Sequence, residues 1–256
     1  MSPVDACATM AKYRRLLVVV ALVGLSAGCV GFLTGTQALE FSANRTVASD
    51  AALQQTGYQE ANNQTVTNVV NIGAAGQERQ VNLTSYLYVY NRTVDANDLN
   101  ESQLAALGGG PDTTRLPEGG ARTPPGETSG DSTDVPLGNA SGLVTFSVLA
   151  MPNARVGGQS VHPLSRVSSE RLVRRFLARG NTSVRFVGNH TVESLDGERT
   201  VSTFRVEGGQ GPGVVVHVAT FDAGNDYVVA FGVHPGVIDE RDRIDTLLAG
   251  LDQPFV

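Results

Sequence analysis

Four segments of alternating polar and apolar residues constrain the fold of this chain more than any other feature. They cover residues 183–195, 199–207, 213–221 and 226–234. The short connections between them are rich in glycine and aspartate, and turns of this kind join antiparallel neighbours. The pattern therefore predicts a meander of four antiparallel strands.

Further elements are predicted on both sides of this meander. An apolar strand at 142–151 and a helix at 169–179, capped by Ser168, precede it, and a helix at 238–251 follows it. Nearer the N-terminus, a short helix begins at Ser49 or Asp50 and ends at Gly57, and a strand pair encloses the turn at 73–78. This order predicts an α+β domain, a mainly antiparallel sheet with helices packed on one or both faces, two-layer or sandwich-like.

One stretch of the chain lacks the apolar residues that a core needs. Residues 103–141 are rich in Gly, Pro, Ser, Thr and Asp. Such a segment cannot bury enough apolar surface to offset its chain entropy, so we expect a disordered loop there.

The N-terminus has the composition of an export signal. Polar residues ending in Arg14 and Arg15 precede an apolar run, and Leu25-Ser26-Ala27-Gly28-Cys29 follows as a lipobox. The arginine pair indicates twin-arginine or general export, and lipidation is expected on Cys29. The alternative is an uncleaved anchor helix at 16–33. The expected organisation is a signal peptide at 1–28, a lipidated tether at 29–40, the domain's N-terminal part at 41–102, the loop at 103–141 and the main part at 142–256.

Charge and lysine content narrow the class of protein. The net charge of the 256 residues is −6, and Lys12 is the only lysine. An acidic chain is a poor partner for nucleic acid, which requires cations to neutralise phosphate. Acidity with few lysines is similar to the composition of proteins from salt-loving archaea.

Asparagine-linked glycosylation motifs are more frequent than chance predicts. Eight of the 14 asparagines stand in Asn-X-Ser/Thr sequons, against about two expected from the Ser and Thr content. The alternative is that Thr-rich strands produce such motifs by chance. Asn82 and Asn189 lie inside predicted strands, where they could be masked. The remaining six are the glycosylation candidates: Asn44, Asn63, Asn91, Asn100, Asn139 and Asn181.

No residue constellation indicates catalysis, so we predict no enzyme, no catalytic residue and no cofactor. Histidines at 162, 190, 217 and 234 lack metal-ligand spacing, and no metal site is predicted. The acidic residues at 239–245 are explained by helix capping and by an Asp239–Arg243 pair.

Two sets of side chains are candidate binding surfaces. The first is a ligand groove, for which a second buried sheet face is an equal alternative; its residues are Tyr86, Tyr88, Tyr90, His162 and His234. The second is a basic patch for a partner or lipid headgroups, for which a solvated helix face is the alternative. It consists of Arg171, Arg174, Arg175 and Arg179.

The lipobox, "TGY" at 56–58, the Pro/Gly-rich interruption, "VHPLS" and the C-terminal "VVAFGVHPGVIDERDRIDTLLAGLDQP" together resemble a family of haloarchaeal surface lipoproteins that share a domain of unknown function. The resemblance implies a location on the extracellular face of the cell membrane. It implies no activity and no catalytic residues.

We therefore expect a lipid-anchored, glycosylated surface protein that acts as a non-enzymatic accessory or interaction module. The alternative is a solute-binding lipoprotein with a small-molecule cleft. The expected partners are the membrane, through the lipid, and a membrane protein or a small solute, but no nucleic acid.

Overall fold

The computed structural model describes part of the chain. The described residues are 38–74, 77–94, 99–107, 143–156, 159–160, 164, 167–177, 182–208 and 213–254. The signal peptide, Cys29 and the segment 108–142 therefore lie outside the described residues.

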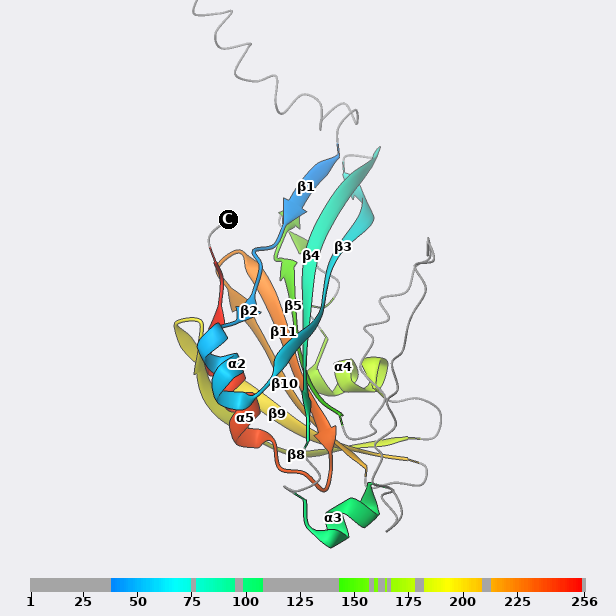
Figure 1. The fold of residues 1–256 in the computed structure, drawn as a ribbon. Helices are drawn as coiled ribbons and strands as arrows, with labels where there is room; N and C mark the ends of the chain where they lie inside the picture. The colour runs from blue at the N-terminus through cyan, green and yellow to red at the C-terminus, as the bar shows by residue number, and fades with distance from the viewer. Residues whose placement is uncertain are drawn as a thin grey trace, which may run out of the picture. The chain divides into compact units, whose positions relative to one another are not determined.

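Strands dominate the described chain (Figure 1). The strands are β1 (Leu39–Ser42), β2 (Val47–Ala48), β3 (Gln59–Ala74), β4 (Gln77–Thr93), β5 (Leu143–Pro152), β6 (Arg155–Val156), β7 (Gln159–Ser160), β8 (Ser183–Ser194), β9 (Gly197–Glu207), β10 (Val214–Ala223), β11 (Asp226–Pro235) and β12 (Leu251–Asp252). The helices are α2 (Asp50–Thr56), α3 (Glu101–Ala106), α4 (Ser169–Phe176) and α5 (Arg241–Ala249).

The eight-stranded sheet runs in the order β1-β4-β5-β11-β10-β9-β8, with β3 also paired to β4. The predicted meander is present, because β8 pairs with β9, β9 with β10 and β10 with β11, each time antiparallel. One turn differs from its prediction. Leu195 and Asp196, with φ of 45° and 59°, are its central residues, whereas Leu195 was expected in the strand at 183–195 and Gly197 in the connection that follows it. Gly197 instead pairs with Ser194 in the ladder, as a two-residue hairpin turn with two left-handed positions requires.

The prediction of an α+β domain with a helix-covered sheet was wrong, because the protein is mainly β. The described helices contain six to nine residues and are therefore about 9 to 14 Å long. The strand spacings from β4 to β8 alone add up to about 24 Å. Helices this short cannot cover such a sheet.

The chain divides into two compact units. The described residues of the first are 38–41, 67–74 and 77–83, where Val81 and Leu83 are buried. The second unit comprises residues 42–66 and 84–256, and contains the candidate functional site described below.

Two apolar clusters lie on opposite faces of the sheet in the second unit. One cluster joins Phe146 and Val201 to Ile244 and Leu247 of α5 and to Ala52 of α2. The other joins sheet residues of the opposite parity to Leu172 and Val173 of α4. Ser168 caps α4 as predicted, and of the two candidates Ser49 and Asp50 it is Ser49 that caps α2, since each serine side chain accepts a hydrogen bond from a first-turn backbone N–H. Leu251 and Asp252 of β12 pair with Ala48 and Val47 of β2.

Candidate functional site

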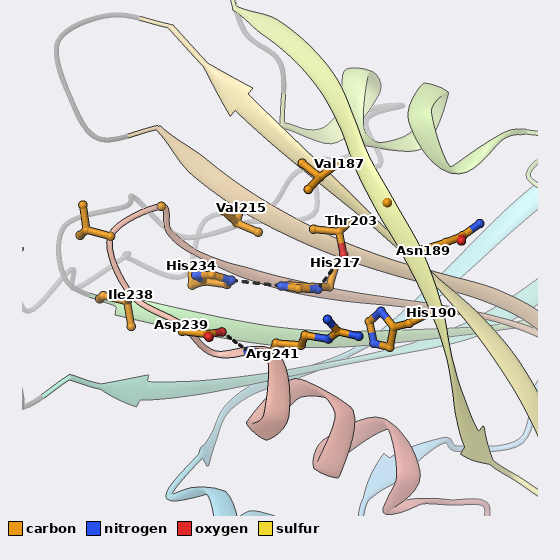
Figure 2. A pocket seen from close by; sticks show the side chains of 13 residues that line it. Val187, Asn189, His190, Thr203, Val215, His217, His234, Ile238, Asp239 and Arg241 are labelled. Carbon is orange, nitrogen blue, oxygen red and sulfur yellow. Dashed lines mark hydrogen bonds between the residues drawn. The ribbon is translucent and has the colours of Figure 1, made fainter.

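A cavity of about 470 Å³ opens where β8, β9, β10 and β11 meet the segment that leads into α5 (Figure 2). Its lining combines apolar and polar residues: Val187, Gly188, Asn189, His190, Thr203, Val215, His217, His234, Gly236, Val237, Ile238, Asp239 and Arg241. Cavities of roughly 300 to 1,000 Å³ accommodate small-molecule ligands. The size therefore suits a small solute.

Two backbone features shape this cavity. A β-bulge between Phe186 and Gly188 interrupts the β8–β9 register next to the cavity wall. At Gly232 of β11, a Cβ atom would lie 2.5 Å from Cδ1 of Ile244. The absence of a side chain at Gly232 thus lets α5 pack against the sheet, and this brings Asp239 and Arg241 to the cavity.

A chain of hydrogen bonds crosses the cavity wall (Figure 2). Thr203 Oγ1 lies 3.2 Å from His217 Nδ1, and His217 Nε2 lies 3.1 Å from His234 Nε2. His234 Nδ1 lies 3.0 Å from the carbonyl oxygen of Pro235. The register explains the proximity, because Thr203 stands opposite His217 and Val215 stands opposite His234.

The direction of each bond follows from the last acceptor. The Pro235 carbonyl can only accept, so His234 Nδ1 donates to it. Nε2 of a neutral His234 then accepts from His217 Nε2–H, and His217 Nδ1 accepts from the Thr203 hydroxyl. Both imidazoles can be satisfied while they remain neutral.

Burial keeps both histidines neutral. Each is about 4% exposed. Desolvation, with a smaller contribution from the neighbouring His234, lowers the pKa of His217 to about 3. Burial also lowers the pKa of His234. The pair is therefore uncharged at neutral pH.

A third histidine of the cavity is held by helix α5. His190 Nε2 lies 2.8 Å and 3.0 Å from the two carboxylate oxygens of Asp245. Arg241 Nε lies 3.8 Å from Asp245 Oδ2, and the backbone N–H of Arg241 donates to Asp239 Oδ1 over 3.2 Å. The His190–Asp245 contact joins β8 to α5, and the Arg241 contacts stabilise the start of the helix.

A buried carboxylate lies behind the cavity loop. Glu240 is 1% exposed and accepts hydrogen bonds from Arg92 and from Arg243 Nη1, the latter over 3.3 Å. The hydroxyl of Tyr58 donates to Glu240 Oε2 over 3.3 Å, and burial raises the pKa of that hydroxyl. Glu240 thus ties the loop before α5 to β4 and to the end of α2.

The polar side chains of this site bind one another and so stabilise the shape of the cavity. The ring nitrogens of His217 and His234 all have partners. Among the described residues, no group of three or more His, Cys, Asp or Glu side chains could hold a metal ion. A ligand would meet the half-exposed guanidinium of Arg241, the remaining lone pair of Thr203, and the apolar Val187, Val215 and Ile238.

A family model described as a domain of unknown function, DUF6517, matches residues 45–124 and 127–252. The chain belongs to the DUF6517 family. No curated protein matches the chain significantly. The matched segments include every residue of the cavity, so the site lies within the DUF6517 domain.

The DUF6517 domain places the members of the predicted tyrosine groove in different surroundings. Tyr90 is 1% exposed, packs against Phe146 and accepts a hydrogen bond from the Ala48 N–H. Tyr88 packs partly buried against the same apolar cluster. Tyr86 is half-buried beneath Arg45. His234 joins His217 instead, and His162 lies outside the described residues.

The basic patch is placed in part. Arg171, Arg174 and Arg175 are exposed on α4, and Arg179 lies outside the described residues. Arg174 forms an ion pair with Glu170 at 2.8 Å and donates to the Val184 carbonyl. Arg174 thus has a carboxylate partner on its own helix, and the prediction of a docking patch stays a prediction.

The sequons differ in how the fold presents them. Asn44, Asn63, Asn100 and Asn189 are exposed, whereas Asn82 and Asn91 are half-buried, each with a buried Oδ1 atom. Asn139 and Asn181 lie outside the described residues. Asn189 is therefore not masked by its strand.

The leader residues Arg14, Arg15 and Cys29 lie outside the described residues. Within the described residues, no helix is long and apolar enough to span a membrane.

Several site residues were missed by sequence reasoning. Thr203, His190 and Asp245 are brought together by strand register and by helix packing, for which the sequence carries no local signal. Glu240 was assigned to a capping cluster, and Arg243 was paired with Asp239, but Arg243 binds Glu240 instead. The strands predicted at 213–221 and 226–234, which contain His217 and His234, are confirmed as neighbours.

Proposed function

We propose that this DUF6517 protein is a lipid-anchored, N-glycosylated surface protein of a haloarchaeon that acts as a non-enzymatic accessory or interaction module. The lipobox at 25–29, the acidic lysine-poor composition and the excess of sequons support the location. The Cys29 thiol would carry a two-chain lipid, because a single chain anchors a protein only weakly.

The observation that carries the non-enzymatic role is the hydrogen-bond chain from Thr203 to Pro235. General acid–base work requires a titratable group whose pKa lies near the working pH and that can reach a substrate. Here both imidazoles are buried, neutral and engaged with each other. The arrangement supports a fixed surface for recognition.

The experiment is the native mass of the full chain after gentle extraction from haloarchaeal membranes, compared with a Cys29→Ser variant. We expect a mature mass that begins at Cys29 and includes lipid and sugar, with the variant released into the medium. A wild-type mass that retains residues 1–28 without lipid would refute the lipoprotein assignment. Co-purification of a stoichiometric polypeptide would identify the partner of an accessory protein.

A second candidate function is capture of a small polar solute, which the cavity of about 470 Å³ favours. Gly188 lines this cavity, and a Cβ there would meet no atom within 4 Å. A Gly188→Val variant should therefore narrow the cavity at little cost in stability. Thr200→Val is the matched control, because Thr200 is exposed on the neighbouring β9 with the opposite parity to Thr203.

The readout is thermal stabilisation by a panel of monosaccharides and amino acids. Solute capture predicts that one class raises the Tm of the wild type and of Thr200→Val but not that of Gly188→Val. Equal shifts in all three proteins, or none, would argue against this cavity as a solute site.

A further inference from the structure

Two long strands of the sheet, β3 and β8, have a neighbour on one side only. Among the described residues, β8 pairs with β9 alone and β3 pairs with β4 alone. Strands at an edge expose backbone donors and acceptors, and they associate with other edges unless something blocks them.

The exposed large apolar side chains of the described residues lie on these same two strands. Val69 on β3 is 55% exposed, and Phe186 and Val187 on β8 are 53% and 55% exposed. Apolar side chains on an open edge increase its tendency to self-associate. Both strands therefore require a group that blocks their open edge against self-association.

Each of these strands also carries one accessible sequon. Asn63 and Thr65 on β3 are exposed, and so are Asn189 and Thr191 on β8. Residues i and i+2 of a strand share a face, so the fold presents the amide and the hydroxyl of each sequon together. Asn189 makes no hydrogen bond through its side chain within the described chain, and Asn63 makes only an exposed one, to Glu60.

The other described sequons are presented less well. Thr46, the third residue of the Asn44 sequon, is fully buried, and Asn44 Nδ2 donates to the buried Asp226 over 2.8 Å. Asn82 and Asn91 have buried Oδ1 atoms. Asn100 caps helix α3 with its side-chain oxygen.

We propose that N-linked glycans on Asn63 and Asn189 cover the open edges of the two long strands β3 and β8. A glycan is bulky and strongly hydrated, so it prevents a second strand from approaching Val187 or the outer edge of β3. This inference rests on the proposed surface location, where the protein meets a glycosylation machinery.

Glycopeptide mass spectrometry of the full chain, produced in a haloarchaeal host, tests the modification. Trypsin releases residues 46–79 and 186–199, each of which contains a single sequon. We expect sugar on both peptides. Thr191→Ser should keep the glycan at Asn189, whereas Thr191→Val should lose it while Asn189 remains.

Two negative outcomes are distinguishable. Sugar on other sequons with none on these two peptides would overturn the inference and leave the proposed function standing. No sugar on any sequon would overturn this inference together with the glycosylated part of the proposed function.

Sedimentation velocity tests the covering role. The Asn63→Gln/Asn189→Gln double variant should self-associate at a concentration at least tenfold lower than the wild type, and Asn100→Gln should behave as the wild type. Circular dichroism of the double variant verifies that it folds. A folded double variant that remains monomeric would overturn the covering role.

Discussion

At the scale of single residues, the His217–His234 pair sets a pH dependence of stability. Burial holds the pKa of His217 near 3, well below the ordinary value of 6.5, so the unfolded chain binds a proton that the folded chain excludes. Where the unfolded state binds more protons, stability rises with pH. The stabilisation is complete above about pH 6.5 and is lost as the pH falls towards 3.

We therefore predict that the free energy of unfolding falls by up to about 1.4 kcal/mol per pH unit from this site below pH 6. In His217→Gln, whose amide can still donate to His234, this slope should be smaller. Urea denaturation of both proteins at pH 5 and 7 measures the difference between their slopes. Burial raises the pKa of Asp226, so this group contributes a slope of the opposite sign. Because both proteins contain Asp226, its contribution cancels in the difference. Equal slopes would contradict a buried neutral His217.

Glu240 is the second residue whose contribution to the free energy of unfolding can be measured separately. Glu240→Gln preserves the volume but leaves Arg92, whose side chain is 12% exposed, without its counter-charge. Breaking a buried ion pair on one side costs about 3 to 5 kcal/mol. Asp242→Asn, an exposed change in the first turn of the same helix, should cost less than about 0.5 kcal/mol. Similar losses in the two variants would show that the Glu240 contacts contribute little.

At the scale of elements, the contact between β11 and α5 positions the cavity. Gly232→Ala would place a methyl group 2.5 Å from Ile244 Cδ1 and 2.9 Å from Cγ1 and Cγ2. Overpacking of this kind costs about 1 to 3 kcal/mol. We predict that Ile244→Ala relieves the clash. The double variant should then lose less free energy of unfolding than the sum of the losses of the two single variants.

Chemical denaturation of the four proteins of this cycle measures the coupling. Gly188→Ala serves as the control, because its new Cβ meets no atom within 4 Å. Simple additivity of Gly232→Ala and Ile244→Ala would mean that α5 is not held by this contact.

The elements also show what sequence reasoning can and cannot supply. The meander at 183–234 was predictable because alternation and turn chemistry are local properties. The cap Ser168 was predictable for the same reason, whereas Ser49 was one of two candidates. The full length of β3 was not predictable from the sequence, because most side chains at 59–71 are exposed and show no apolar alternation. This strand is specified by its pairing with β4, which lies later in the chain.

For the candidate site, the sequence predicted only which strands are neighbours. His217 and His234 could be assigned to adjacent strands, but their meeting depends on the register that pairs Val215 with His234. The partnership of His190 with Asp245 depends on where α5 docks, and the buried role of Glu240 depends on Arg92, which lies 148 residues away. Such long-range contacts leave no periodic signal in one sequence.

At the scale of the whole molecule, pairing of β2 with β12 connects the start and the end of the second unit. Leu251 is buried in the cluster that contains Ala48 and Ile244, whereas Asp252 is exposed. Leu251→Ala should cost about 2 to 4 kcal/mol through the cavity it creates, and Asp252→Ala should cost less than about 0.5 kcal/mol. Thermal unfolding checks this, and an equal effect of the two changes would mean that β12 does not anchor the unit.

The β2–β12 pair also determines how late in synthesis the second unit can complete its folding. The partner of Ala48 is Leu251, so the strand pair cannot form until residue 251 has left the ribosome. Contacts between segments so distant in sequence form slowly, because a long loop must be closed first. Until residue 251 has been synthesised, Val47 and Ala48 therefore lack their strand partner, and folding of the second unit is completed late in synthesis.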